Sequence, residues 1–164
     1  MIDKMPTAIV LSRQNLTQFG KGAMAEKGGY IVEDTVGNPD VLLLATGSEV
    51  ELCVKAKALL ENGGVKARVI SLPCIEKFKE QNFEYQDSVI PRSVQVRVCV
   101  EAASPLGWRE FAGNYGEVIA MNTFGLSGNY RMLYSHFGFT PDNIRDKAIK
   151  SASEYIAALT RLKK

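Results

Sequence analysis

The sequence predicts an α/β fold: a three-layer α/β/α sandwich built on a mostly parallel, mixed sheet of about five strands. Three observations predict it. Residues 41–45 form an unbroken apolar run, typical of a strand that is covered on both faces. Residues 48–64 then show helical periodicity, and residues 65–72 indicate a second strand. Strand-like and helical segments continue to alternate along the chain, which favours a parallel sheet with helices on both faces.

The composition fits one ordinary domain with an appendage. The chain has 164 residues, of which 46% are hydrophobic, and a net charge of +2. No basic run exceeds Lys163-Lys164, so we expect no nucleic-acid partner. No apolar run approaches the roughly 20 residues of a membrane helix, so we expect no membrane partner. The three separated cysteines, Cys53, Cys74 and Cys99, are typical of reduced thiols and predict a cytoplasmic location.

The central helix has predictable ends and a predictable buried face. Ser48 and Glu51 have the spacing of a capping box, which starts a helix by bonding its first turn. Gly63 and Gly64 predict its end, because glycine tolerates the left-handed conformation of a C-cap. We expect Lys57 to lie outside the core-facing stripe. That stripe contains Leu52, Cys53, Ala56, Leu59 and Leu60.

Before this unit, residues 6–11 predict a strand, and residues 15–29 form a polar connector without a sustained period. A short strand at residues 30–33 follows. A strand ahead of a long connector is unusual in a self-contained domain. We therefore expect the chain to begin inside a larger architecture.

After residue 72, short elements alternate until one long helix. Thr140, Pro141 and Asp142 predict the start of that helix, since they supply a hydroxyl cap, a fixed φ and an acidic first turn. Its predicted core face contains Ile144, Ala148, Ala152, Tyr155, Ile156, Leu159 and Leu162. The shorter elements are helices at 75–81, 106–112 and 130–136, strands at 94–100 and 117–121, and loops at 82–88 and 125–129.

Gly47 and Ser48 form a candidate anion site. They lie between a strand and the amino terminus of a helix, where free backbone N–H groups attract anions. Glu49 and Glu51 oppose this interpretation, because their carboxylates complement the helix dipole and repel a phosphate. The chain has neither GxGxxG nor GxxxxGK[ST], so structural capping is the favoured interpretation.

Three further residues carry candidate chemistry. Glu101 ends a buried-looking strand and suits a general acid or base if burial raises its pKa, although a structural role is favoured. His136 is the sole histidine, so the sequence offers no histidine-based metal site or catalytic triad. Arg13 follows an apolar strand, where a guanidinium suits bidentate recognition of phosphate or carboxylate; a surface ion pair is the alternative. We predict no catalytic residue and no metal ligand.

Several segments, in order, resemble the carboxyl-terminal part of transketolases. They are PTAIVLSRQNL (6–16), GGYIVED (28–34), PDVLLLATGSEVELCVKA (39–56), VKARVISLPCIEKFKEQ (65–81), SVQVRVCVEAASPLGW (93–108), NTFGLSG (122–128) and LYSHFGFTPDNI (133–144). The resemblance implies a fold like the carboxyl-terminal domain of that family. It also implies a homodimeric parent enzyme that transfers a two-carbon ketol unit between sugar phosphates in the pentose phosphate pathway.

The family uses thiamine diphosphate and Mg²⁺ (or Ca²⁺). This sequence lacks the GDG…N motif and the pyrimidine-domain segment that hold them. We therefore expect the chain to bind no cofactor alone, to be non-catalytic, and to act as scaffold and dimer support. Its expected partners are the remaining transketolase domains, a second subunit and sugar phosphates.

One functional residue follows from the resemblance. The arginine of LSRQ contacts the sugar-phosphate group in the family, and here it is Arg13. Residues 1–20 then correspond to the end of the pyrimidine-binding domain and a linker, and residues 21–164 to the carboxyl-terminal domain. Residues 103–106 and 128–129 depart from the family pattern. A small-anion or nucleotide-binding regulatory module, or the equivalent domain of dihydroxyacetone synthase, is the alternative.

Overall fold

The computed structural model describes residues 8–20 and 22–162. Its centre is a five-stranded sheet in the order β1-β3-β2-β4-β5. β1 pairs antiparallel with β3, and the other three pairings are parallel. The mostly parallel, mixed sheet predicted from the sequence is therefore confirmed. The strands are β1 (Tyr30–Glu33), β2 (Val41–Ala45), β3 (Ala67–Ser71), β4 (Arg97–Glu101) and β5 (Glu117–Ala120).

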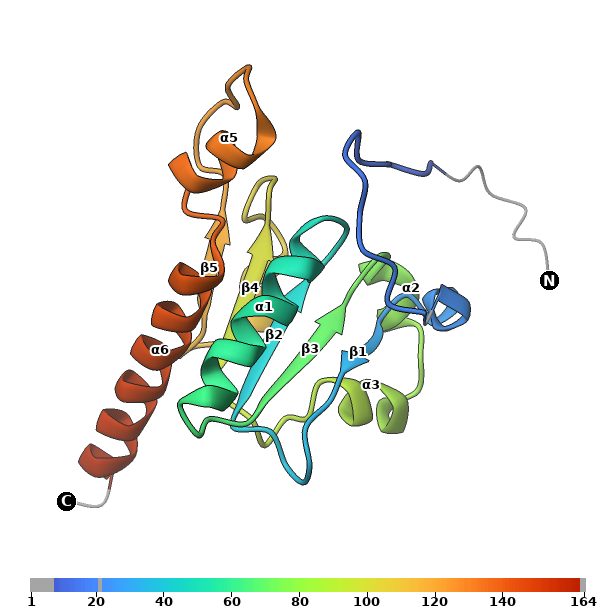
Figure 1. Cartoon of the computed structure of the whole chain (residues 1–164). Helices are drawn as coiled ribbons and strands as arrows, with labels where there is room; N and C mark the ends of the chain where they lie inside the picture. Colours follow the sequence, from blue (N-terminus) through green and yellow to red (C-terminus); the bar gives the residue numbers. More distant parts are fainter. Residues whose placement is uncertain (1–7, 21, 163–164) are drawn as a thin grey trace.

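Helices cover both faces of this sheet (Figure 1). α1 (Glu49–Asn62) and α6 (Pro141–Leu162) pack on one face and on each other. The opposite face is covered by α2 (Ile75–Lys79), α3 (Phe83–Val89) and α4 (Trp108–Ala112). α5 (Tyr130–His136) lies beyond the carboxyl end of β5, and the 3₁₀ helix η1 (Gly22–Lys27) lies near β1. The three-layer sandwich is confirmed.

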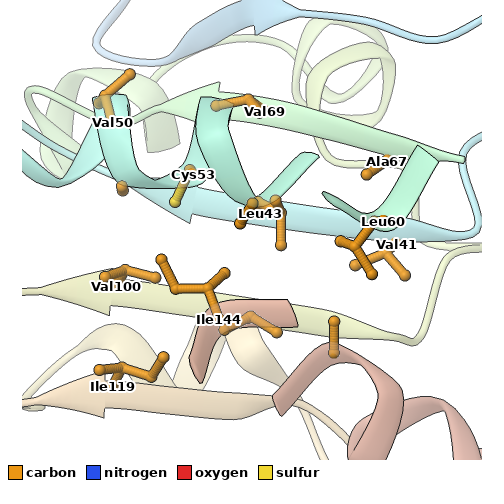
Figure 2. Close-up of a cluster of buried hydrophobic side chains, with 14 of the residues drawn as sticks. Val41, Leu43, Val50, Cys53, Leu60, Ala67, Val69, Val100, Ile119 and Ile144 are labelled. Atoms are coloured by element: carbon orange, nitrogen blue, oxygen red, sulfur yellow. The ribbon is translucent and has the colours of Figure 1, made fainter. Parts of the chain in front are cut away.

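β2 shows why an unbroken apolar run forms a central strand. Its side chains alternate between two cores, because successive residues of a strand point to opposite faces. Val41, Leu43 and Ala45 join the core under α1 and α6, shown in Figure 2. Leu42 and Leu44 join the core under α2, α3 and α4. All five are at most 1% exposed, so neither face of β2 tolerates a polar side chain.

The predicted end of helix α1 is confirmed, whereas the predicted capping box at its start is wrong. Gly64 adopts φ +80°, the left-handed conformation that ends a helix, and α1 stops at Asn62. The capping box does not form. Ser48 has helical backbone angles and donates its hydroxyl proton to the neighbouring Glu49, while Glu51 pairs with Lys55 at 2.6 Å.

Lys57 is the second correction on α1. The sequence pattern places it outside the core stripe, yet it is only 8% exposed. Its ammonium group lies 2.8 Å from a carboxylate oxygen of Glu61 and 3.9 Å from one of Glu33. A long aliphatic stem can be buried while its charged end reaches carboxylates, and helical periodicity alone does not predict this.

Two predictions on short segments were wrong. Residues 82–88 are mostly helix α3 rather than loop, because the Asn82 side chain accepts the backbone N–H of Tyr85 and caps the first turn. Residues 8–11 are irregular rather than a strand, and Ile9, Val10 and Leu11 are 78–95% exposed. Pro6 and Thr7 lie outside the described residues. An apolar strand segment without a neighbouring strand has no partner for its backbone groups.

The final helix, α6, is buried along its predicted core face over only half its length. It starts at Pro141, and Thr140 accepts the backbone N–H of Asn143. The predicted face is buried at Ile144 and Ala148 but exposed further along, because the last turns of α6 extend past the other elements (Figure 1). The exposed members are Ile156, Leu159 and Leu162. No helix within the described ranges is long and apolar enough to cross a membrane.

Candidate functional site

The candidate site lies at the carboxyl ends of β2 and β4. From β2 the chain crosses through α1 to β3 on one side, while β4 lies on the other side. The strand order therefore diverges between β2 and β4. In open α/β sheets this divergence marks the place where ligands usually bind. The residues that follow β2 and β4 meet there.

A buried carboxylate occupies this point. Glu49, in the first turn of α1, is only 3% exposed. Its Oε2 accepts the backbone N–H of Ala102 at 3.2 Å, which ties α1 to the chain that follows β4. Its Oε1 accepts the hydroxyl of Ser48 at 2.8 Å. A carboxylate at this end of a helix also complements the helix dipole, so Glu49 supplies the negative charge that a bound anion would otherwise supply.

Tyr134 connects helix α5 to the carboxylate of Glu49. It lies on α5, and its hydroxyl donates a short hydrogen bond to Oε1 of Glu49. The same hydroxyl oxygen lies 2.8 Å from Oγ of Ser48. Burial and donation to Glu49 both raise the pKa of Tyr134, so the phenol stays protonated and keeps donating. Sequence reasoning missed this pair, because the two residues are 85 positions apart and no local pattern joins them.

Glu101 completes the acidic cluster. It ends β4 and is half-buried. Burial, and secondarily the nearby Glu49 carboxylate, raise the pKa of Glu101 to about 7. Glu101 was expected to suit acid–base chemistry only if burial raised its pKa, and its pKa is raised. Acid–base catalysis also requires a substrate group within hydrogen-bonding reach of the carboxyl group.

Gly47 and Ser48 do not form an open anion site. Gly47 is exposed with φ +55°, and the Ser48 hydroxyl is engaged by Glu49 and Tyr134. The buried carboxylate of Glu49 adds repulsion toward a second anion at the same helix end. Anion binding at these two residues stays a prediction, and the geometry opposes it.

A cavity of about 320 Å³ lies beside the acidic cluster. One side is formed by Gln14, Asn15 and Leu16 of the irregular segment at residues 8–20, from here on called the amino-terminal connector, and the other side by residues of α1 and α5. Gln14 and Leu16 line this cavity together with Glu51 of α1 and Tyr134 of α5. The connector therefore rests on the same two helices that meet at Glu49.

Arg13 immediately precedes Gln14 and is exposed. It makes no ion pair with another described residue, which leaves its guanidinium available to a ligand. His136 is exposed at the end of α5, where its ring contacts that of Phe137. Within the described residues, no group of three or more His, Cys, Asp or Glu side chains could hold a metal ion.

The part of the edge next to β5 carries exposed apolar side chains. They lie on the loop between β4 and α4, on the loop between β5 and α5, and on α5 itself. The exposed fractions run from 56% for Leu126 to 97% for Phe124. The set is Leu106, Phe124, Leu126 and Met132. Apolar side chains this exposed at a domain's functional edge are typical of a surface covered by another domain or subunit.

The fold and the site together define a doubly wound α/β domain whose switch point is closed by its own carboxylate. Residues 28–140 match the family model described as the transketolase-like TK C-terminal domain. The chain is 43% identical over 150 residues to a transketolase of Aquifex aeolicus and 44% identical over 147 residues to transketolase 1 of Escherichia coli. These alignments cover 88% and 87% of this chain, and 22% of each relative.

A solved transketolase structure is also similar to this chain in its fold. A transketolase from Pichia stipitis, in complex with sedoheptulose 7-phosphate, superposes with a TM-score of 0.79 at 37% identity, covering 88% of this chain and 21% of that one. The chain belongs to the transketolase family and corresponds to its carboxyl-terminal domain. It spans about a fifth of the length of the curated relatives that it matches.

Proposed function

We propose that this chain is the carboxyl-terminal portion of an enzyme that transfers a two-carbon ketol unit between sugar phosphates, in the pentose phosphate pathway of the cytoplasm. The observation that carries the proposal is an identity of 43–44% with transketolases over 87–88% of the chain. Four-fifths of each relative lies outside that alignment, so most of the parent enzyme lies elsewhere.

Thiamine diphosphate and Mg²⁺ (or Ca²⁺) belong, in this proposal, to those other domains. The residues present do not fit the cofactor or its metal. The sequence has no GDG…N motif, and the described residues offer no cluster of metal-ligating side chains. Metal-bound diphosphate needs carboxylate and carbonyl oxygens arranged around the ion. We therefore assign no catalytic step to this chain.

The role that remains is to support the catalytic domains and the homodimer. The exposed apolar side chains at the carboxyl edge favour this role, because burying them against another domain or subunit stabilises the assembly. Residues 1–20 would end the pyrimidine-binding domain and link it to the domain formed by residues 21–164. The exposed apolar segment at residues 9–11 fits a strand whose sheet lies in that preceding domain.

Arg13 is the proposed contact to the substrate. A guanidinium can hold a phosphate through two charge-assisted hydrogen bonds. Arg13 is exposed and makes no competing ion pair with a described residue. It also immediately precedes Gln14, which lines the cavity beside α1 and α5.

The test is Arg13→Ala in the full-length enzyme. Losing charge-assisted hydrogen bonds worth about 1.5–3 kcal/mol should raise the KM for phosphorylated acceptors by roughly 10- to 100-fold. The KM for an unphosphorylated aldehyde acceptor should not change. Arg161→Ala removes an exposed arginine from the far end of α6 and serves as the matched control. An Arg13→Ala enzyme with an unchanged KM for phosphorylated acceptors would remove Arg13 from the site.

A further inference from the structure

The cavity of about 320 Å³ between the amino-terminal connector and α5 has no part in the proposed function. Figure 1 shows α5 and the connector on either side of the start of α1, and the cavity lies between them. Ser48, which follows β2, lines it, so the cavity lies at the edge of the sheet where ligands usually bind. Sites for small molecules combine apolar walls with a few polar groups that orient the ligand.

The inner part of this cavity is apolar and aromatic. Phe139 is only 2% exposed there, and its ring centroid lies 5.6 Å from that of Tyr134. Leu52 of α1 and Leu16 of the connector add aliphatic walls. Behind Tyr134 lies the buried carboxylate of Glu49, which accepts the Tyr134 hydroxyl and repels any anion placed nearby. The inner part therefore suits an uncharged ring.

The rim of the cavity carries an arginine with unused donors. Arg131 of α5 is exposed and lines the cavity, and its Nε donates to the hydroxyl of Tyr130 at 3.1 Å. A guanidinium has five N–H donors, and the other four of Arg131 donate to no described residue. Lys55 also lines the cavity, but its ammonium group lies 2.6 Å from a carboxylate oxygen of Glu51. Arg131 is therefore the cation available to a ligand.

Tyr130 keeps this guanidinium beside the aromatic wall. The Cζ atom of Arg131 lies 5.7 Å from the centroid of the Tyr130 ring, a distance at which a cation is attracted to a ring face. The Tyr130 ring in turn meets the Tyr134 ring edge-on, with their centroids 6.0 Å apart. The two free NH₂ groups of a guanidinium match the oxygens of a carboxylate or a phosphate. The rim thus suits an anionic group next to the apolar interior.

We propose that this cavity binds a small molecule made of an aromatic ring and one anionic group, either a carboxylate or a phosphate. The ring lies between Leu16, Leu52 and Tyr134, and the anionic group stays at the rim, where Arg131 binds it. The repulsion from Glu49 inside and the attraction to Arg131 outside fix this orientation. Arg13 does not line the cavity, so the site is separate from the proposed contact to the substrate.

The test is an NMR titration of the ¹⁵N-labelled 164-residue chain with phenyl phosphate and with benzoate. At least one of these probes should shift the amide signals of residues 14–16, 51–55 and 130–135, and the tighter one identifies the preferred anionic group. Phenol lacks the charge, while inorganic phosphate and acetate lack the ring. All three should therefore bind at least about 10-fold more weakly than the tighter probe.

Two variants test the two ends of the site. Arg131→Ala should weaken binding of the tighter probe by roughly 10-fold, because it removes the charge-assisted hydrogen bonds at the rim. Leu16→Ser should weaken it by about 3- to 10-fold by removing an apolar wall, and Leu16 lies outside both cores, so the fold is kept. Arg161→Ala removes an exposed arginine at the far end of α6 and should leave the affinity unchanged.

Arg13→Ala separates this site from the proposed substrate contact. Binding of the probe should persist in this variant. Binding that is lost with Arg13→Ala but kept with Arg131→Ala would assign the probe to the substrate contact and overturn the cavity site. In the full-length enzyme carrying Arg13→Ala, calorimetry should find the same roughly 10-fold effect of Arg131→Ala.

Three further results would overturn the proposal. The first is a titration in which neither probe shifts the signals of the residues around the cavity. The second is an affinity of inorganic phosphate or acetate equal to that of the tighter probe, since the ring would then contribute nothing. The third is an affinity that Arg131→Ala leaves unchanged, in the chain or in the full-length enzyme.

Discussion

The edge of the sheet at the carboxyl ends of its strands has two halves. In one half the side chains pair with each other, and in the other they are left exposed. The closed half is formed by Ser48, Glu49 and Tyr134, which hydrogen-bond within this chain, with Glu101 beside them. The open half, formed by residues 102–107 and 122–132, exposes apolar side chains as large as Phe124. The closed half thus contributes to the stability of the domain itself. The open half becomes useful only when another domain or subunit covers it.

The largest expected effect lies in the closed half. Glu49→Ala removes the acceptor of the Ala102 N–H and of the Tyr134 hydroxyl. The free energy of unfolding of the 164-residue chain should fall by about 2–3 kcal/mol, measured by urea denaturation. Glu110→Ala, which removes an exposed glutamate on α4, should change it by less than about 0.5 kcal/mol. Equal effects of the two changes would contradict the distinction between the closed half and the surface.

A pH dependence should come from Glu101. Its pKa is about 7 in the folded chain, against 4.5 for an ordinary glutamate, because of burial and the neighbouring Glu49. Between these two values the folded state binds more protons than the unfolded state, so stability falls as the pH rises. We expect a loss of about 1–2 kcal/mol, since partial contact with solvent reduces the full effect.

The measurement is urea unfolding of the chain at several pH values from 4.5 to 8. Glu101→Gln has no proton to exchange there, so its variant should lose this part of the slope. A wild-type slope that survives unchanged in the Glu101→Gln variant would assign the pH dependence to another group.

The cap of α5 tests how far the closed half supports its neighbour. The Asn129 side chain accepts the backbone N–H of Arg131 at 3.0 Å and caps the helix. Asn129→Ala should cost about 0.5–1 kcal/mol of unfolding free energy, the lower part of the usual range for a cap. The effect is small because Tyr134 still ties α5 to Glu49. A loss above about 2 kcal/mol would show that the cap, rather than Tyr134, holds α5.

The smallest effect is expected in the open half. Phe124→Ser and Leu126→Ser should change the unfolding free energy of the chain by less than about 0.5 kcal/mol, because both side chains are already exposed. In the full-length enzyme the same pair should lower the thermal midpoint of the assembly. Differential scanning calorimetry of both forms measures the contrast. A full-length enzyme with an unchanged midpoint would show that nothing covers this surface.

The sequence predicted the sheet well because its signals are local. The unbroken apolar run of β2 and the glycine at position 64 depend on neighbouring residues alone. The prediction of a loop at residues 82–88 was wrong because it overlooked Asn82 as a helix cap, although Asn is a typical capping residue. Arg68 and Arg97 show what no local pattern reveals. Each donates to backbone carbonyls far along the chain and links separate segments of the fold.

The candidate site was predicted only in part. Glu101 was singled out at the correct strand end, and the opposition of Glu49 to an anion at Gly47 was anticipated. The capping box failed because the hydroxyl of Ser48 found Glu49 and Tyr134 instead. A partner 85 residues away cannot be read from spacing. The family resemblance, rather than periodicity, supplied the role proposed for Arg13.

We propose that this chain is one domain of a ketol-transferring enzyme and holds none of its coenzyme. The most direct measurement is an assay of ketol transfer between two sugar phosphates, with thiamine diphosphate and Mg²⁺ supplied. The 164-residue chain alone should transfer nothing, while the full-length enzyme should be active in the same buffer. Ketol transfer by the purified chain alone would contradict the account.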